Sequence, residues 1–350
     1  MGKIKIGFVG AGGMGQCAHL RNYVPLPDVE VVAIAELRPE LAKRVATKYG
    51  IPHVYPNHEA MFANEKLDAI VAAQQFTIHG QIVPELLKVG VPLLTEKPVA
   101  SNIPAGEKIV EAVKKSGTFY MVANHKRSDP ATMYAKAEIE RLKVSGEVGK
   151  LKYVRIIMPA GDWVASGFTD LVHTDEAYPQ LKQDPRPDDL DEENYRKYVG
   201  FVNYYIHQVN MMRHLLGEPY KVTYVDPNDC VMVVTTDSSV TGTIEMSPYT
   251  TSVAWQEQMF VCFEHGTIKV DLPSPLAMFR PGHVEVMLDP GNGKTPMTCS
   301  PTLPWIGAMQ QQAMNFVAAI KGERRPPCEA AEALEDLRIA RQYIKILKGI

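Results

Sequence analysis

The chain has 350 residues, more than a single hydrophobic core usually organises, so we expect two domains. Hydrophobic residues make up 45% of the chain and charged residues 22%, as is typical of soluble globular proteins. The net charge of −3 gives no electrostatic reason to expect nucleic acid or an anionic membrane as a partner. No apolar run approaches the ~20 residues that a membrane-spanning helix needs.

The cysteines are widely spaced, without C-x-x-C or zinc-ligand spacing, and occur at Cys17, Cys230, Cys262, Cys299 and Cys328. We interpret them as buried thiols in a reducing compartment, which predicts a cytoplasmic protein with no metal site. The first five residues lead directly into a predicted strand and leave no room for a cleaved signal peptide.

A glycine-rich turn follows the predicted strand at residues 3–9 and precedes a predicted helix at residues 16–23; it consists of Gly10, Ala11, Gly12, Gly13, Met14 and Gly15. This order lets the N-terminus of a helix point its free amides at a pyrophosphate. Gly10 permits the tight turn, Gly12 lets the backbone approach the phosphates, and Gly15 lets helix and strand pack closely. The motif alone is weak evidence, because glycine-rich turns are common.

Glu36 strengthens this interpretation, because it directly follows the next predicted strand, residues 29–35, and lies 21 residues beyond Gly15. A carboxylate there accepts hydrogen bonds from the adenosine ribose and repels a 2′-phosphate. The alternative is a solvated acid at the end of a strand. Arg38 complicates the choice, since an arginine here suits a 2′-phosphate. We predict NAD, with NADP the less favoured cofactor.

The rest of the first 123 residues alternates strands with helices. Further strands are predicted at residues 67–72, 91–95 and 119–123, and helices at 39–50, 78–88 and 103–115. Such alternation predicts a doubly wound parallel sheet whose ligand lies at the carboxyl ends of the strands. Lys97 follows one of those ends, where partial desolvation would favour its neutral form for proton transfer. The alternative is a surface lysine beside a turn proline.

Several motifs together resemble the glucose–fructose oxidoreductase and inositol dehydrogenase family (Gfo/Idh/MocA). They are the glycine turn, His79 at the start of a helix, Glu96-Lys97-Pro98, and Asn124-His125-Lys126-Arg127-Ser128-Asp129-Pro130. The resemblance implies a Rossmann domain at residues 1–123 and an α+β domain at 124–350. It also implies an open, mainly antiparallel second sheet, often used in homodimers or homotetramers, and a cis Pro98. Carried over by motif, His79, Glu96, Lys97 and Pro98 contact the cofactor, and Asn124 and Arg127 contact the substrate.

Past residue 123 the pattern changes to hairpin-like spacing. Strands are predicted at residues 151–158, 221–225, 230–235, 240–246, 258–263 and 267–270, which indicates an antiparallel sheet. Helices are predicted at 132–142, 306–321 and 330–347, and the last two are candidates to pack back on the first domain. Residues 159–197 form a long acidic connection, either a solvated surface or a lid over the substrate. Asp162 and Asp175 from this connection are candidate substrate ligands.

A predicted helix at residues 198–217 carries a polar stripe on an apolar background, formed by Asn203, His207, Asn210 and His214. A metal site is unfavourable, because His207 and His214 lie ~10 Å apart along a helix axis. The family resemblance implies a catalytic histidine here, matched by His207, with an aspartate four residues earlier. Asn203 occupies that aspartate position, and Asn210 stands where an aspartate is frequent. Asparagine orients an imidazole but lends it no charge; Asp162, Asp175 or Glu176 are candidates to supply that charge.

The leading hypothesis is an NAD-dependent enzyme that oxidises a secondary hydroxyl of a sugar, glycoside or polyol. His207 with Lys97 would remove the hydroxyl proton, and Asn203 would position the imidazole ring. One alternative is a redox-neutral glycosidase that oxidises its substrate transiently and eliminates the glycosidic bond. Another is a non-catalytic sensor that binds NAD and a sugar or a regulatory protein.

Overall fold

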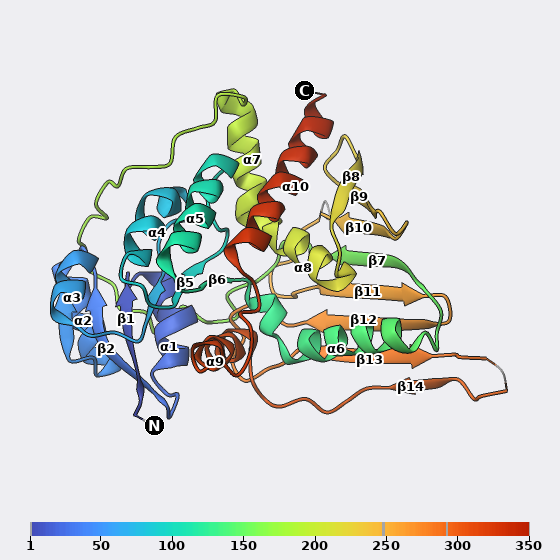
Figure 1. Ribbon diagram of the computed structural model, residues 1–350, viewed down its shortest axis with the longest axis horizontal. Helices are drawn as coiled ribbons and strands as arrows, with labels where there is room; N and C mark the ends of the chain where they lie inside the picture. The colour runs from blue at the N-terminus through green and yellow to red at the C-terminus, as the bar shows by residue number, and fades with distance from the viewer. Residues whose placement is uncertain (1, 247–248, 292, 350) are drawn as a thin grey trace. The chain divides into compact units, whose positions relative to one another are not determined.

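The computed structural model describes residues 2–246, 249–291 and 293–349 (Figure 1). Met1 and Ile350, the outer limits of the two predicted domains, lie outside these residues. The chain forms two compact units, each made of several segments. Unit 1 comprises Met1–Asn124, Ser166–Val199 and Met309–Leu337; unit 2 comprises His125–Ala165, Gly200–Ala308 and Arg338–Ile350. The predicted division at residues 1–123 and 124–350 concerns binding roles and stays a prediction.

Unit 1 contains a six-stranded sheet in which every pairing is parallel. Its strands are β1 (Ile4–Val9), β2 (Val29–Ala35), β3 (His53–Tyr55), β4 (Ala69–Ala72), β5 (Leu93–Glu96) and β6 (Tyr120–Ala123), in the order β3-β2-β1-β4-β5-β6. The order reverses direction at β1 and β4, which creates the switch point where ligands of doubly wound sheets bind. The predicted Rossmann-type sheet is confirmed.

The helices of this part of the chain begin and end at sequence signals. They are η1 (Gly15–Leu20), α1 (Arg21–Tyr23), α2 (Pro39–Tyr49), α3 (His58–Asn64), η2 (Phe76–Ile78), α4 (His79–Leu87) and α5 (Ile103–Ser116). The side chain of Asn102 accepts a hydrogen bond from the Ala105 amide and caps α5, which ends at Gly117 with φ 70°. The predicted helix at 16–23 is a π-helical turn followed by a short α-helix. The short elements β3 and α3 were not predicted.

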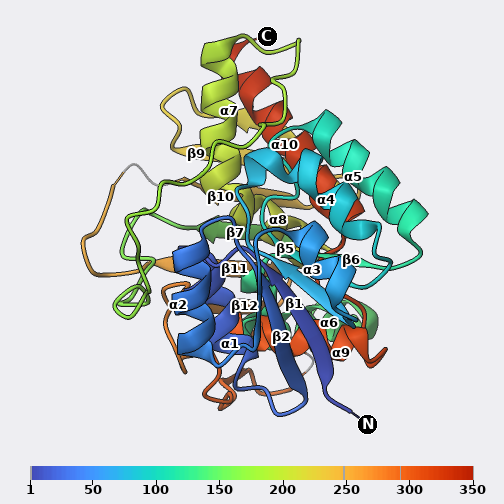
Figure 2. The same ribbon diagram turned by 90° about the vertical axis from the view of Figure 1, so that its left-hand side faces the viewer.

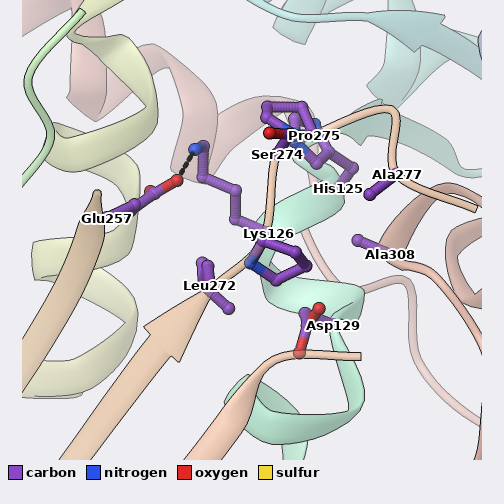
Figure 3. A pocket seen from close by; sticks show the side chains of 10 residues that line it. His125, Lys126, Asp129, Glu257, Leu272, Ser274, Pro275, Ala277 and Ala308 are labelled. Atoms are coloured by element: carbon purple, nitrogen blue, oxygen red, sulfur yellow. Dashed lines mark hydrogen bonds and ion pairs between the residues drawn. The ribbon is translucent and has the colours of Figure 1, made fainter. Parts of the chain in front are cut away.

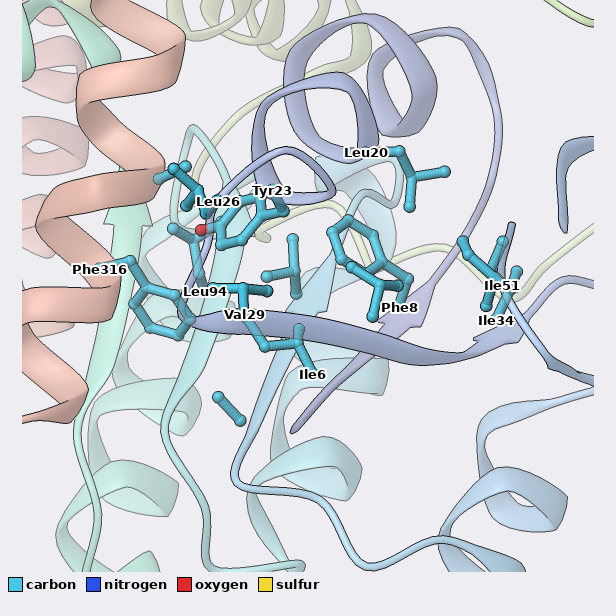
Figure 4. Close-up of a cluster of buried hydrophobic side chains, with 14 of the residues drawn as sticks. Ile6, Phe8, Leu20, Tyr23, Leu26, Val29, Ile34, Ile51, Leu94 and Phe316 are labelled. Carbon is cyan, nitrogen blue, oxygen red and sulfur yellow. The ribbon is translucent and has the colours of Figure 1, made fainter. Parts of the chain in front are cut away.

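The core of unit 1 joins the sheet to a helix from far along the chain. Phe8 on β1 packs edge-on against Tyr23, with ring centroids 5.6 Å apart, and Tyr23 lies 6.4 Å from Phe316 (Figure 4). Phe316 belongs to α9 (Ala308–Ile320) and is fully buried in the same hydrophobic cluster. Burying these aromatic rings fixes the helix that follows the glycine turn against the sheet.

Unit 2 contains an eight-stranded sheet. Its strands are β7 (Leu151–Ile157), β8 (Tyr220–Val225), β9 (Val231–Thr236), β10 (Thr241–Glu245), β11 (Glu257–Phe263), β12 (Gly266–Leu272), β13 (His283–Leu288) and β14 (Met297–Cys299), in the order β14-β13-β12-β11-β7-β10-β9-β8. Only the β7–β10 pairing among these strands is parallel, so the mainly antiparallel sheet is confirmed. Helix α6 (Pro130–Ser145) packs against β12 and β13, and α8 (Ile206–Leu216) against β7 and β10 (Figure 1).

The predicted helix at 198–217 is wrong in its extent and continuity. It consists of α7 (Glu192–Tyr204) and α8, interrupted at Tyr205, where ψ is −3°. The Tyr205 hydroxyl donates to the Met246 carbonyl oxygen at 2.6 Å, a long-range contact that holds the break. Helix α7 also begins inside the predicted acidic connection, where Asp191 accepts from the Asn194 amide. Asn203 and His207 therefore do not share one continuous helix, and Asn203 is exposed.

The C-terminal helix α10 (Ala330–Lys348) matches its prediction closely. The prediction of five buried cysteines is wrong in part. All five are free thiols, but Cys230 and Cys262 are half-buried and Cys299 is exposed. Cys299 lies on β14, an edge strand whose residues are all exposed, which explains why a buried site was the wrong expectation. Every helix within the described residues is too short or too polar to cross a bilayer.

Candidate functional site

The glycine turn joins β1 to η1 at the switch point of the unit 1 sheet. Gly10 has φ +92°, and a Cβ there would lie 2.7 Å from the Ala73 carbonyl oxygen. A Cβ on Gly15 would lie 2.6 Å from the Gly10 carbonyl oxygen. Both distances are shorter than any real Cβ contact, so a side chain at either position would displace backbone.

The middle of the turn is open by comparison. A Cβ on Gly12 would approach only Arg38 Nη2, at 3.6 Å, and a Cβ on Gly13 would approach only Leu171, at 3.7 Å. The amides of the turn precede the start of η1, where the helix dipole favours an anion. These residues fit the pyrophosphate of a dinucleotide, because backbone can approach the ligand without obstruction.

Glu36 is buried beyond the end of β2 and bonds to both the turn and Arg38. Its Oε2 accepts from the Ala11 amide at 2.8 Å, and its Oε1 accepts from Arg38 Nε at 2.9 Å. Arg38 Nη2 completes a bidentate pair at 3.2 Å. The guanidinium is therefore neutralised by the adjacent carboxylate, which removes the complication that Arg38 raised. A 2′-phosphate would meet Glu36 first, so this geometry favours NAD over NADP.

Glu96 ends β5 and is buried against a histidine from η1. Its Oε1 lies 2.7 Å from His19 Nε2, and its Oε2 accepts from the Lys97 amide at 3.2 Å. Burial favours a higher pKa for Glu96, but the His19 and Lys97 interactions outweigh it and lower the pKa. The Lys97–Pro98 peptide bond is cis, as expected. Glu96 thus fixes the backbone that carries Lys97.

His79 and Asn124 are two further predicted site residues, and both are buried within unit 1. His79 is fully buried, with Nδ1 at 3.1 Å from the Pro98 carbonyl oxygen and 3.2 Å from that of Val99. Burial lowers the pKa of His79, so the neutral ring supports the Pro98 turn. The Asn124 side chain donates to Cys328 Sγ at 3.2 Å. Direct contacts of His79 with cofactor and of Asn124 with substrate stay predictions.

His207 begins a polar cluster within unit 2. Its ring lies edge-on to that of His125, with centroids 5.1 Å apart. Arg127 belongs, with His125, to the short helix η3 (His125–Ser128). Its Nε donates to Asn210 Oδ1 at 2.5 Å, and its Nη2 donates to the Asn210 carbonyl oxygen at 3.1 Å. Asn210 therefore binds the predicted substrate residue Arg127 through neutral oxygens. Burial lowers the pKa of His214 well below its usual range, which agrees with a structural role.

A buried ion pair between Lys126 and Glu257 lies beside this cluster (Figure 3). Gln208, next to His207 in the chain, has Nε2 at 3.4 Å from Glu257 Oε1, and Trp255 Nε1 donates to Glu257 Oε2 at 3.1 Å. Burial lowers the pKa of Lys126, and Glu257 offsets only part of that effect. A small cavity borders the pair and is also lined by His125 and Asp129.

Sequence reasoning missed Glu257, because it begins a strand 131 positions from its partner. The candidates named for the missing charge have other contacts. Asp162 accepts from the Val164 and Ala165 amides in its own turn, Glu176 belongs to unit 1, and Asp175 is exposed in unit 1. The carboxylate that the structure brings nearest to Gln208 is thus none of these three. Substrate contacts of Asp162 and Asp175 stay predictions.

Comparison with known proteins agrees with the geometry of unit 1. Residues 4–124 match the family model Gfo/Idh/MocA, described as an oxidoreductase family with an NAD-binding Rossmann fold. This match covers about a third of the 350-residue chain. Inositol 2-dehydrogenase of Acidothermus cellulolyticus is 32% identical over 147 residues, which cover 42% of this chain and 42% of that enzyme. The family match lies in the part of the chain that contains the parallel sheet and the glycine turn.

Two further similarities extend the Gfo/Idh/MocA comparison over the full length. An uncharacterized oxidoreductase of Bacillus subtilis (YrbE) is 21% identical, covering 97% of this chain and 93% of that protein. The structure of a levoglucosan dehydrogenase in complex with NADH and levoglucosan has a TM-score of 0.72 at 18% identity, covering 99% and 98% of the two chains. At that identity the structure supports the fold alone.

Replacing Glu36 by alanine should change cofactor preference, because it releases the Arg38 guanidinium toward a 2′-phosphate. We expect the Kd for NAD to rise about tenfold, the effect of losing about 1.4 kcal/mol, and the Kd for NADP to fall. Calorimetric titration with both cofactors measures this, and Glu30→Ala, an exposed acid on the same strand, is the matched control. Unchanged NAD binding in Glu36→Ala would contradict the assignment.

Asp129 gives a pH-dependent test of the cavity in unit 2. Burial raises its pKa to about 6, although it accepts from the Ala131 amide at 2.8 Å and the Gly282 amide at 3.0 Å. The folded chain thus holds this proton more tightly than the unfolded chain, whose aspartates titrate near ~3.9. The stability that this group contributes is present below about pH 4 and is lost as pH rises through about 6.

The free energy of unfolding of the wild type, relative to Asp129→Asn, should therefore fall between pH 4 and 6, by up to about 1.4 kcal/mol per pH unit. Denaturant titrations across this range measure the difference. Asp188→Asn, at an exposed position, should show no such slope. A difference that stays constant with pH would mean that Asp129 titrates normally.

Proposed function

We propose that this protein oxidises a secondary hydroxyl of a sugar, glycoside or polyol with NAD as hydride acceptor. The observation that supports this most is the glycine turn with Glu36 bonded to the Ala11 amide, at the switch point of a parallel sheet. The Gfo/Idh/MocA match over the same residues supports the redox chemistry. Bound NAD would supply the hydride acceptor, and the residues of the chain would manage the proton.

The proton-transfer roles fall to His207 and Lys97. When a secondary alcohol is oxidised, its carbon loses a hydride and its hydroxyl loses a proton. A side chain must accept that proton near neutral pH, and histidine is best suited to do so. His207 lies beside His125 at the start of α8, within a cluster of polar side chains. Lys97 follows a strand end whose backbone is held by Glu96. We assign the main base role to His207 and an assisting role to Lys97.

The substrate class is proposed from the relatives. They include inositol 2-dehydrogenase, scyllo-inositol 2-dehydrogenase (NAD(+)) of Bacillus subtilis and levoglucosan dehydrogenase of Pseudarthrobacter phenanthrenivorans. All three names describe dehydrogenases of cyclic polyols or sugar derivatives. Two of these alignments cover less than half of the relative, so the substrate of this chain follows from them only as a proposal.

Two variants test the roles. Lys97→Ala and His207→Ala should each lower kcat by ~10²–10⁴, the usual contribution of a positioned acid or base, while the Kd for NAD stays within about threefold. The measurement is NADH formation with a panel of inositols, sugars and glycosides. Lys88→Ala and His53→Ala, whose side chains are mostly exposed, are matched controls.

The outcome also separates the alternatives. Cleavage of a glycoside without net NADH would identify a redox-neutral glycosidase. NAD and sugar binding without any turnover would identify a sensor. Full turnover in Lys97→Ala would remove Lys97 from the mechanism and leave His207 as the base.

A further inference from the structure

Part of the acidic connection packs across the cofactor end of unit 1. The side chain of buried Gln16, one residue beyond the glycine turn, bonds to both backbone groups of Val172. Gln16 Oε1 accepts from the Val172 amide at 2.9 Å, and Gln16 Nε2 donates to the Val172 carbonyl oxygen at 3.1 Å. Leu171 is the side chain nearest to Gly13. Residues 170–178, here named the strap, therefore begin directly over the turn.

The strap then follows helix α2 from its C-terminal end to its N-terminus. Asp170 pairs with Lys48, in the last turn of α2, at 3.0 Å and also with Arg21. Glu176 accepts from the Glu40 amide at 3.0 Å and the Leu41 amide at 2.8 Å, and so caps the first turn. In Figure 2 this part of the connection runs beside α2.

The far end of the strap reaches the residues that bind ribose in our assignment. The centroid of the Tyr178 ring lies 5.1 Å from Arg38 Cζ, and Arg38 forms an ion pair with Glu36. Tyr178 is 42% exposed with Arg38 over its ring, so part of the aromatic surface is available to a ligand beside the ribose site. One end of the strap thus lies beside the phosphate turn, and the other end contacts Arg38, the partner of the ribose carboxylate Glu36.

We infer that the strap is a wall of the cofactor site, in which Tyr178 stacks against the adenine of NAD and Gln16 latches the strap over the pyrophosphate turn. This rests on the cofactor site of the proposed function but not on its substrate or its proton chemistry. It is an alternative to the two roles predicted for the acidic connection, a solvated surface and a substrate lid. The surface ion pairs at Asp170 contribute little, so the partly buried Gln16–Val172 bonds are the main restraint on cofactor release.

The mechanism predicts faster cofactor release when the wall or latch is weakened. Tyr178→Ala should raise the NADH dissociation rate about tenfold, as expected for losing one base–aromatic stacking contact. Tyr178→Phe keeps the ring and should remain within about twofold of the wild type. Gln16→Met, similar in volume but unable to bond Val172, should also speed release. His173→Ala, an exposed strap position, is the control. Stopped-flow fluorescence of NADH measures all four.

Limited trypsin digestion of the full chain gives a second readout, through cleavage at exposed Lys182 just beyond the strap. ADP-ribose, which carries the adenosine and pyrophosphate without nicotinamide, should protect this site as well as NAD does. Protection that appears only when a polyol is added with NAD would overturn the inference in favour of a substrate lid. Equal NADH dissociation rates in Tyr178→Ala and wild type would also overturn it, while leaving the proposed function intact. Failure of the wild type to bind NADH would overturn both.

Discussion

The backbone of Gly15 lies so close to the Gly10 carbonyl oxygen that position 15 tolerates no side chain, and the cofactor end of unit 1 depends on this contact. A Cβ on Gly15 would stand 2.6 Å from that oxygen. Because of this contact, η1 begins close to the end of β1, and the backbone amides of residues 11–14 lie between them at the cofactor site. It also places Ala11 within 2.8 Å of Glu36 and aims Gln16 at the strap. The close approach of Gly15 to Gly10 thus helps to position the phosphate turn, the Glu36 carboxylate and the strap relative to one another.

A second buried contact holds the lysine loop in the same frame. Glu96 is hydrogen-bonded to His19, which lies in η1 just after the glycine turn. The His79 ring is hydrogen-bonded to the Pro98 carbonyl oxygen. A buried carboxylate is unfavourable unless it is hydrogen-bonded and paired. Both oxygens of Glu96 are hydrogen-bonded, one to His19 and the other to the Lys97 amide. The position of Lys97 is therefore coupled through His19 to the glycine turn.

Local signals made the first unit predictable. Strand β1, the glycine turn, β2 and Glu36 follow each other within 36 residues, and each has a pattern that short-range physics explains. The failures have long-range causes. The break at Tyr205 depends on a hydrogen bond to Met246, and the pair of Lys126 with Glu257 joins residues 131 positions apart. Neither contact leaves a periodic signal in the sequence. The strap was noticed only as an acidic connection, because its bonds to Gln16 involve backbone atoms.

The replacement of acidic residues by asparagine changes the electrostatics of the unit 2 cluster more than its shape. Asn210 still offers two oxygens to Arg127, so the contact that an aspartate would make survives without the charge. Residue 210 therefore leaves the positive charge of Arg127 in place, and this charge adds to burial in lowering the pKa of His214. A neutral histidine is the form that accepts a proton from a hydroxyl. The negative charge of the cluster resides instead on Glu257, where Lys126 balances it within the same buried pair. The base role proposed for His207 needs an uncharged ring, and asparagine at position 210 contacts Arg127 without adding a carboxylate to the cluster.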